Sequence, residues 1–325
     1  MSFFKKIFPD PLIFYLIIAL LLAFFYPQLS FFNINDITLK SIINIGVVIV
    51  FFFYGLKLKW DEVFKDLMNW KLHVRIQLIT FLLFPLIGLI LYPFVKVDES
   101  YYLLFLALFY LCCLPSTVSS SVVMVSIAKG NITSAIFNAS LSGLIGIVLT
   151  PLWMSIFINQ GGEIDSFTIF IDLILKVVLP VLIGALLQPY FGKYYEKYKN
   201  TLSNVDKLTI VLIVYESFSH TFSDGLLLQF GYKKLFILII AVILIFFIVF
   251  YLIAFLNKTF WKFNREDFIV LQFCGTKKSL VHGSVIGSIL FGSDIGFVLL
   301  PIMIYHTFQL LFISYKASLY AKEVV

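Results

Sequence analysis

The chain has 325 residues, of which 61% are hydrophobic and 13% are charged, and its mean hydropathy is +1.01. Soluble domains run nearer a quarter charged, so this chain carries more apolar surface than a soluble core could bury, and lipid must be its main solvent. The net charge of +6 comes from lysines in short loops between apolar runs. Lysines placed in this way set the orientation of membrane spans and do not form a basic face that would bind nucleic acid.

The first apolar run follows Lys5 and Lys6 and superficially resembles a signal peptide. No small-x-small cleavage site follows it, and Tyr26 and Pro27 close it, so we expect an uncleaved first membrane span. A bilayer core needs about 20 apolar residues of helix. Ten runs near that length are present: 12–28, 40–57, 72–95, 101–129, 131–158, 166–190, 207–225, 233–257, 267–291 and 294–318.

The distribution of positive charge predicts the orientation of these spans. With ten spans, 17 of the 24 Lys and Arg residues fall on the side of the N-terminus and four fall opposite, while Lys176, Lys277 and Lys278 lie inside spans. The positive-inside rule then places both termini in the cytoplasm, which requires an even number of spans.

The ten spans form two groups of five, residues 1–158 and 159–325, and we expect the basic segment 188–207 to be a cytoplasmic loop. In each half the fourth span is the most polar, and a short turn that contains glycine leads into the fifth. Because five is odd, a repeated unit must take the opposite orientation in the second half. This inverted-repeat plan is typical of secondary transporters.

Proline and hydroxyl side chains interrupt the fourth span at residues 115–121. Pro115 removes a backbone hydrogen bond, and Ser116, Thr117 and the serines that follow could coordinate an ion or satisfy freed backbone groups. The alternative is a simple kink at which the serines bond to carbonyls one turn back.

The ninth span contains two lysines about ten residues from either end, after Gly275. A lone charge there costs at least about 2.5 kcal/mol, so Lys277 and Lys278 indicate a polar cavity, with snorkelling to an interface as the alternative. A half-helix N-terminus at such a break favours an anion, and the carbonyls that end the preceding half suit Na⁺. His282, one turn further on, could bind substrate, relay protons, or be a packing residue.

Other polar residues in spans form pairs at helical spacing. Gln77 with Thr80, and Asn138 with Ser142, each share one helix face, and either pair could add ligands to a cavity or join helices. We expect Glu216 to pair with His220 for structural reasons, because pairing is the cheapest way to hold charge in a membrane.

At these segments the sequence resembles the bile acid:sodium symporter superfamily, in its SBF-like branch. The resemblance covers nearly the whole chain in order and rests on residues 53–58, 115–121, 128–131, 137–142, 212–215, 273–280 and 300–306. It implies an all-α fold of ten helices in two inverted repeats, with discontinuous, crossing helices four and nine. Spans one, two, six and seven would form a panel, and spans three to five and eight to ten a core.

The resemblance also implies candidate sites. One sodium site would involve Ser119, Ser120 or Ser121 with Asn138 and Ser142. A second would involve Gln77 or Thr80 with the segment that holds Cys274, Thr276 and Lys277. An organic anion would bind near the crossing, for which the candidates are Pro115, Ser116, Thr117, Lys278, Ser279 and His282.

Two positions depart from the pattern of the sodium-binding relatives. Aligned on Gly275, their Glu before the break and Gln after it correspond here to Phe273 and Lys277. Loss of a carboxylate and gain of a cation should weaken Na⁺ binding at a shared site. One hypothesis is that the Lys277 ammonium takes the place of one sodium ion.

The function that these features favour is alternating-access transport of a small organic anion across a bacterial inner membrane, coupled to Na⁺ through an altered site. Proton-coupled or uncoupled transport and a non-transporting membrane regulator are the alternatives. We expect no enzyme and no cofactor beyond a possible Na⁺, because paired intramembrane aspartates, a Gly-x-Ser-x-Gly elbow and a His-Glu-x-x-His motif are all missing from the sequence.

Overall fold

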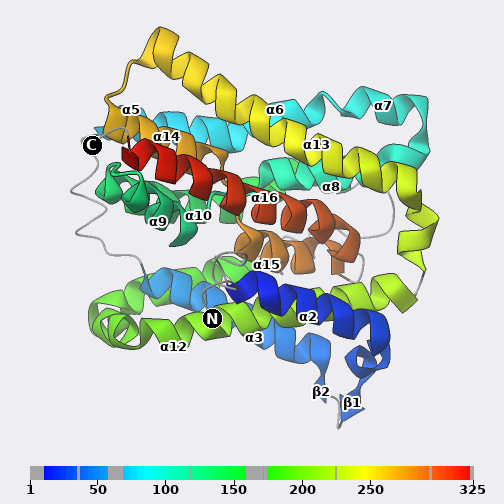
Figure 1. Ribbon diagram of the computed structural model, residues 1–325. Coiled ribbons are helices and arrows are strands. Elements are labelled where there is room, and N and C mark those ends of the chain that lie inside the picture. The colour runs from blue at the N-terminus through cyan, green and yellow to red at the C-terminus, as the bar shows by residue number, and fades with distance from the viewer. Residues whose placement is uncertain are drawn as a thin grey trace. The chain divides into compact units, whose positions relative to one another are not determined.

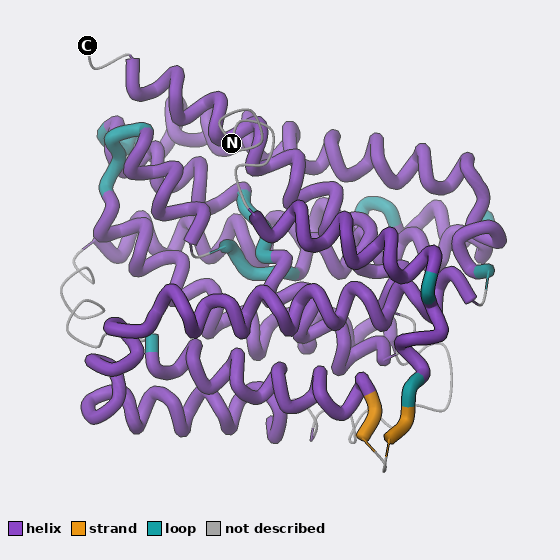
Figure 2. Tube along the Cα trace, turned by 60° about the horizontal axis from the view of Figure 1, so that its bottom comes forward, coloured by secondary structure: helices purple, strands orange, loops and turns teal. Residues whose placement is uncertain are grey.

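A computed structural model shows an almost entirely helical protein (Figures 1 and 2). It describes residues 11–34, 37–57, 69–117, 119–158, 171, 174–223, 225–292 and 295–322. The elements are α2 (Pro11–Phe25), η1 (Pro27–Phe31), β1 (Asn33–Ile34), β2 (Ile37–Thr38), α3 (Leu39–Leu56), α5 (Trp70–Leu78), η3 (Ile79–Leu83), α6 (Phe84–Leu89), α7 (Tyr92–Val97), η4 (Glu99–Tyr101), α8 (Tyr102–Cys113), α9 (Ser119–Ile127), α10 (Ile132–Ile158), η5 (Ile174–Val178), α12 (Leu179–Ser223), α13 (Leu226–Leu256), η6 (Asn257–Trp261), α14 (Arg265–Thr276), α15 (Leu280–Phe291) and α16 (Ile295–Lys322).

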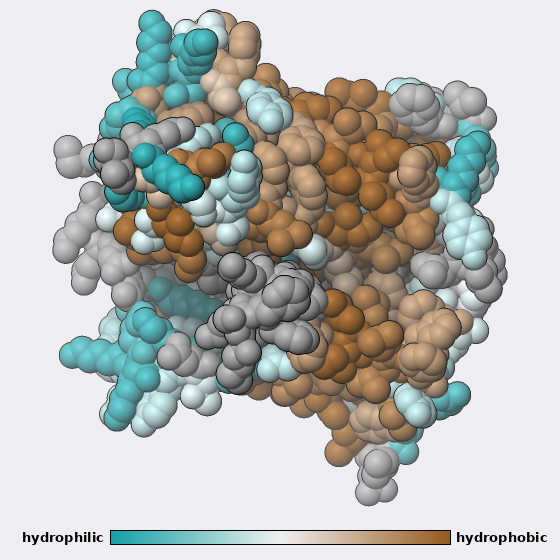
Figure 3. Space-filling model, viewed as in Figure 1, coloured by the Kyte–Doolittle hydropathy of each residue, from teal (hydrophilic) through white to brown (hydrophobic). Residues whose placement is uncertain are grey.

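Six helical segments of the described chain are long and apolar enough to cross a membrane: Leu39–Leu56, Trp70–Leu89, Ile132–Phe157, Ile174–Lys199, Gly231–Trp261 and Ile295–Lys322. Apolar side chains cover the surface over α13 and over α2, and hydrophilic side chains gather toward helix ends (Figure 3). An outward apolar surface of this kind is stable only in lipid. The expectation of an all-α membrane protein is confirmed.

The two interruptions that the sequence predicts are present, and one connection differs from the prediction. The predicted spans 101–129 and 267–291 are each broken in two, as α8 with α9 and as α14 with α15. The predicted loop between spans six and seven is helical, so α12 joins the end of the predicted span 166–190 to the predicted span 207–225 without interruption. The segment 188–207 includes good helix formers such as Glu196 and Lys197, and helix propensity is a weak preference that tertiary packing can override.

The chain divides into two compact units, and the first comprises residues 1–59, 159–231 and 284–299. Within it α3 lies against α12, and two glycines allow the helices to touch. A Cβ on Gly55 would lie 2.2 Å from the carbonyl oxygen of Val181. A Cβ on Gly184 would lie 2.1 Å from the carbonyl oxygen of Phe52. Small residues of this kind permit close approach of helix backbones in membranes.

Some charged side chains of the first unit form ion pairs. Lys57, just after α3, forms a 3.0 Å salt bridge with Asp206 of α12 and lies over the ring of Tyr54 at 4.6 Å. Burial raises the pKa of the Asp206 carboxyl, and the nearby Lys57 partly opposes this shift. The expected pairing of Glu216 with His220 is present, with 3.7 Å between Oε1 and Nε2.

The second unit comprises residues 60–158, 232–283 and 300–325. It contains α5 to α10, α13, α14 and most of α16, and therefore both of the helix breaks. Its interior includes an aromatic cluster: Phe246 of α13 makes edge-to-face contacts with Tyr305, Phe308 and Phe312 of α16, with centroid separations of 5.2 to 5.7 Å. Such pairs add to the packing energy that holds helices together in a bilayer.

Asp267, in the first turn of α14, ties three helix ends of this unit together. Its two carboxylate oxygens accept hydrogen bonds from Asn131 at 2.9 Å and from Asn69 at 3.1 Å. Asn131 and Asn69 begin α10 and α5, and the carboxylate also faces the positive end of the α14 dipole.

Replacing Asp267 with alanine is expected to lower the free energy of unfolding by about 2 kcal/mol, since two charge-assisted hydrogen bonds and a helix-end interaction are lost. The matched control is Glu266→Ala, because the exposed Glu266 shares the same helical turn. Thermal melting of the purified proteins measures both changes. Equal effects of the two substitutions would contradict the assigned role of Asp267.

Candidate functional site

The first break separates α8 from α9. Helix α8 ends at Cys113, and the backbone is extended at Leu114 (φ −71°, ψ 150°), immediately before Pro115. Proline has no N–H to donate and disfavours a helical conformation in the residue before it, so the helix ends here. A helix end leaves carbonyl groups without partners in the helix. The carbonyl of Cys113 accepts a 2.8 Å hydrogen bond from the Thr150 hydroxyl.

The second break separates α14 from α15 and lies slightly after the predicted position. Helix α14 continues through Gly275 to Thr276, and the break comprises residues 277–279. A Cβ on Gly275 would lie 3.2 Å from Ile253 and 3.5 Å from Ile79. The glycine therefore serves close packing of α14, and the chain leaves the helix only at the extended lysine that follows.

The two breaks touch each other. The backbone N–H of Ser279 donates to the carbonyl of Pro115 at 2.9 Å. In the other direction, the Ser116 hydroxyl donates to the carbonyl of Cys274 at 2.7 Å, and the Ser116 N–H donates to Ser142 of α10 at 2.9 Å. Backbone groups that each broken helix frees are thus paired largely with the other break and with α10.

Side chains of α16 satisfy further backbone groups of the second break. The amide of Gln309 accepts from the N–H of Lys278 and donates to its carbonyl, both at 2.8 Å. The hydroxyl of Tyr305 donates to the carbonyl of Thr276 at 2.6 Å. Gln309 was not among the candidate residues, although an amide inside the apolar run 294–318 is a signal that points to one.

Lys277 is fully buried and reaches the start of α9. Its ammonium Nζ donates to the Ser120 carbonyl at 2.7 Å and lies 3.4 Å from the Ser120 hydroxyl. The Thr117 hydroxyl lies 2.8 Å from that of Ser120 and 2.9 Å from that of Ser121. The structure therefore brings Lys277 together with two predicted sodium ligands, Ser120 and Ser121, and with Thr117, which was a candidate for substrate binding. The side chain of Ser119 lies outside the described residues.

Lys278 is also fully buried, and its ammonium points toward a different set of oxygens. Nζ donates to the carbonyls of Cys112 at 2.7 Å, Leu114 at 2.8 Å and Thr80 at 3.0 Å. It lies 3.9 Å from the centre of the Phe84 ring. Among the residues that the structure describes, no carboxylate forms an ion pair with either lysine. Both charges are held by neutral oxygens, and neither snorkels to an interface.

Asn138 and Gln77 form a separate polar cluster between α10 and α5. Gln77 donates to the Asn138 side-chain oxygen at 3.3 Å, and the Asn138 amide lies 2.8 Å from Nδ1 of His73. The predicted grouping of Asn138 with the serines of α9, and of Gln77 with the second break, is not seen as direct hydrogen bonds. His73, which sequence reasoning missed, is a buried imidazole one turn before Gln77.

His282 lies in the first turn of α15, where Ser279 caps the helix. The Ser279 hydroxyl accepts from the His282 N–H at 3.2 Å and lies 3.0 Å from Nδ1 of the same residue. This is the usual bonding of an N-terminal cap. This hydrogen bonding orients the His282 imidazole and is explained by helix capping alone. No group of three or more His, Cys, Asp or Glu side chains suited to a metal occurs among the residues described.

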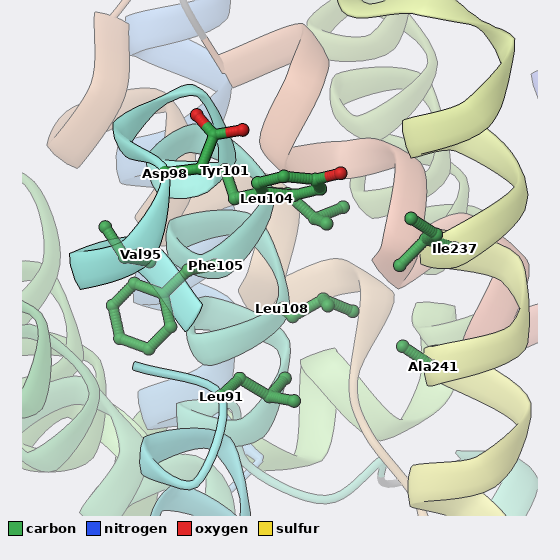
Figure 4. A pocket seen from close by; sticks show the side chains of 9 residues that line it. All are labelled: Leu91, Val95, Asp98, Tyr101, Leu104, Phe105, Leu108, Ile237 and Ala241. Atoms are coloured by element: carbon green, nitrogen blue, oxygen red, sulfur yellow. The ribbon is translucent and has the colours of Figure 1, made fainter. Parts of the chain in front are cut away.

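Two sizeable cavities of the second unit are largely apolar, and neither is lined by Lys277 or Lys278. One, of about 470 Å³, lies between α8 and α13, where Leu91, Leu108 and Ala241 form its apolar end (Figure 4). Asp98 and Tyr101 lie at its other end, where hydrogen bonds from Ser100 lower the pKa of the Asp98 carboxyl. The other, of about 490 Å³, is lined by Trp70, His73, Val74, Gln77, Leu78, Phe81, Leu82, Phe137, Leu141, Ile145 and Leu149.

These observations define an α-helical integral membrane protein with two interrupted helices that meet at buried cationic side chains. The chain belongs to the SBF-like CPA transporter family, whose family model matches residues 10–322. The resemblance drawn from the sequence is thereby confirmed.

Curated relatives agree with this assignment over most of their length. The chain is 32% identical over 321 residues to "Putative symporter YfeH" of Escherichia coli K12, covering 97% of this chain and 93% of the relative. It is 32% identical over 277 residues to "Sodium/bile acid cotransporter 7" of Xenopus tropicalis, covering 83% and 80%. It is 30% identical over 271 residues to the mouse protein of the same name, covering 82% and 79%. The family is one of membrane transporters.

Proposed function

We propose that this protein is a secondary active transporter that moves a small organic anion across a bacterial inner membrane by alternating access. Both termini of the protein would lie in the cytoplasm. In this proposal the chain has ten spans in two inverted repeats, residues 1–158 and 159–325. The excess of Lys and Arg on the side of the N-terminus supports the orientation. The symporter and cotransporter names of the relatives support the activity.

The observation that carries the proposal is the contact between the two broken helices, with two buried lysines at the second break. Non-helical backbone within a membrane protein is tolerated only inside the protein or beside a water-filled cavity. Transporters use such breaks for binding because each exposes helix ends to a ligand at mid-membrane. Two ammonium groups that pair with no carboxylate of the described residues add positive potential, which favours an anionic substrate near Pro115, Ser116 and Ser279.

We propose coupling to Na⁺ through an altered site. The hydroxyls of Thr117, Ser120 and Ser121 are neutral oxygen ligands of the kind that Na⁺ binds, but Lys277 already donates to Ser120. The same geometry supports proton-coupled or uncoupled transport as the alternative, because the lysine would exclude a metal cation. A non-transporting regulator is the remaining candidate.

A binding screen followed by an uptake assay tests the proposal. The melting temperature of the purified full-length protein is measured against organic anions with Na⁺ or choline at several pH values. A ligand present at about one hundred times its Kd should raise the melting temperature by about 5 °C. Uptake of that anion into proteoliposomes under a Na⁺ or proton gradient then identifies the coupling ion. If no organic anion raises the melting temperature, the proposed substrate class is contradicted.

A further inference from the structure

The Lys278 ammonium lies in a cage of backbone carbonyls. Its three acceptors are the carbonyl oxygens of Cys112, Leu114 and Thr80, at 2.7, 2.8 and 3.0 Å, and the face of the Phe84 ring covers the ammonium at 3.9 Å. An ammonium group has three N–H donors, so every donor has one carbonyl acceptor. A neutral amine would leave a lone pair facing a carbonyl, and the geometry therefore fits the charged form.

Two of these carbonyls have no partner within a helix because α8 ends at Cys113, shortly before Pro115. The Cys112 carbonyl would accept from the Ser116 N–H in a continuous helix, but that N–H donates to Ser142 instead. The Leu114 carbonyl lies in the extended segment beyond the helix. Both would be buried without a partner if Lys278 were removed.

The third carbonyl is free because of a local change of helix register. Residues Ile79–Leu83 form a π-helical turn, in which the Phe84 N–H donates to the carbonyl of Ile79. In that register the Thr80 carbonyl would accept from residue 85, which is Pro85 and has no N–H. Two separate departures from α-helical bonding thus aim three carbonyls at one point.

The chemistry of this cage selects a monovalent cation. Its ligands are neutral carbonyls and an aromatic face, whereas divalent ions in proteins take carboxylates or keep several waters. Rings of backbone carbonyls bind alkali cations in membrane proteins in the same way.

We propose that the carbonyls of Thr80, Cys112 and Leu114 form a monovalent-cation site that the protein fills with its own Lys278 ammonium. The tethered cation joins the end of α8, the π-helical turn and the second break into one rigid junction that needs no cation from solution. If the side chain is cut back, the empty cage should bind a small free cation such as methylammonium, Na⁺ or K⁺. This inference does not rest on the proposed transport activity.

Chemical rescue of Lys278→Ala tests the proposal. The purified full-length variant is melted in methylammonium, Na⁺, K⁺ or choline chloride at matched ionic strength, where choline is too large for the cage. In choline it should melt well below the wild type, and at least one of the small cations should raise its melting temperature by about 4 °C. Subtraction of the wild-type response to the same salts removes binding at any other site, including a transport site.

Two further variants make the result specific. Lys278→Met fills the space with an apolar chain and should show no rescue. Lys277→Ala removes the neighbouring buried ammonium, which meets the oxygens of one residue only, and should show a weaker response. If Lys278→Ala is not recovered in choline, the yield of monodisperse protein in each salt becomes the measurement. Recovery in a small cation supports the proposal. No response of Lys278→Ala to any small cation beyond that of Lys278→Met, or failure in every salt, overturns it.

Discussion

Replacing Lys277 with glutamine should raise the affinity of the purified protein for Na⁺ by up to about three orders of magnitude. The reason is electrostatic. A Na⁺ ion bound to the oxygens of Ser120 would lie about 4 Å from the Lys277 ammonium, which already donates to the carbonyl at 2.7 Å. Two unit charges at that separation repel by about 4 kcal/mol at an effective dielectric constant of 20, or about a thousandfold in affinity.

Equilibrium binding of ²²Na⁺ measures this effect. The glutamine side chain is neutral and adds a carbonyl oxygen to the hydroxyls of Thr117, Ser120 and Ser121, so it should restore a site of neutral ligands. Lys277→Arg is the matched control, because it keeps the charge and should bind Na⁺ no better than the wild type. Weaker Na⁺ binding in Lys277→Gln than in the wild type would rule out the idea that the ammonium stands in place of a sodium ion.

Substitution of Gly184 by alanine should cause a large loss of stability in the first unit. The added Cβ would lie 2.1 Å from the Phe52 carbonyl oxygen and 3.1 Å from the Cα of Gly55. Both contacts are with backbone, so neither can be relieved by a rotamer change. We expect a loss of about 3 kcal/mol or more, which corresponds to a fall in melting temperature of about 5 °C or more.

Gly192 in the same helix provides the control. A Cβ there would meet only the side chain of Gln188, which can move, and alanine is the better helix former. Gly192→Ala should therefore be neutral or slightly stabilising. Thermal melting and size-exclusion chromatography of the two variants measure the difference. An unchanged melting temperature for Gly184→Ala would contradict the close approach of α3 and α12.

The sequence predicted the broken helices because their causes are local. Pro115 must end a helix, and two lysines in an apolar run require polar surroundings wherever the chain places them. The second break begins two residues after Gly275, around which the sequence predicts it, because glycine has two uses. At Gly275 it allows close packing against Ile253, and the turn is made by the extended backbone at Lys277.

The partners of the lysines could not be predicted because they are mostly backbone atoms from distant segments. The Thr80 carbonyl is available only because a π-helical turn precedes Pro85, and no pattern of side chains revealed that change of register. Gln309, which bonds to the backbone of Lys278 at the second break, is 31 positions away in the sequence. The expected ion ligands remain a prediction, and in the structure Asn138 and Gln77 bond to each other.

Tracer counterflow in proteoliposomes tests the central claim, alternating-access transport, most directly because it requires no knowledge of the coupling ion. Vesicles loaded with the unlabelled anion found by the binding screen are diluted into medium with a trace of labelled anion. A transporter should accumulate label transiently above its equilibrium level, since outward movement of unlabelled anion returns the binding site to the outside. Equilibration of label without an overshoot would indicate a channel, and no entry of label would indicate a regulator. Either result would contradict transport by this protein.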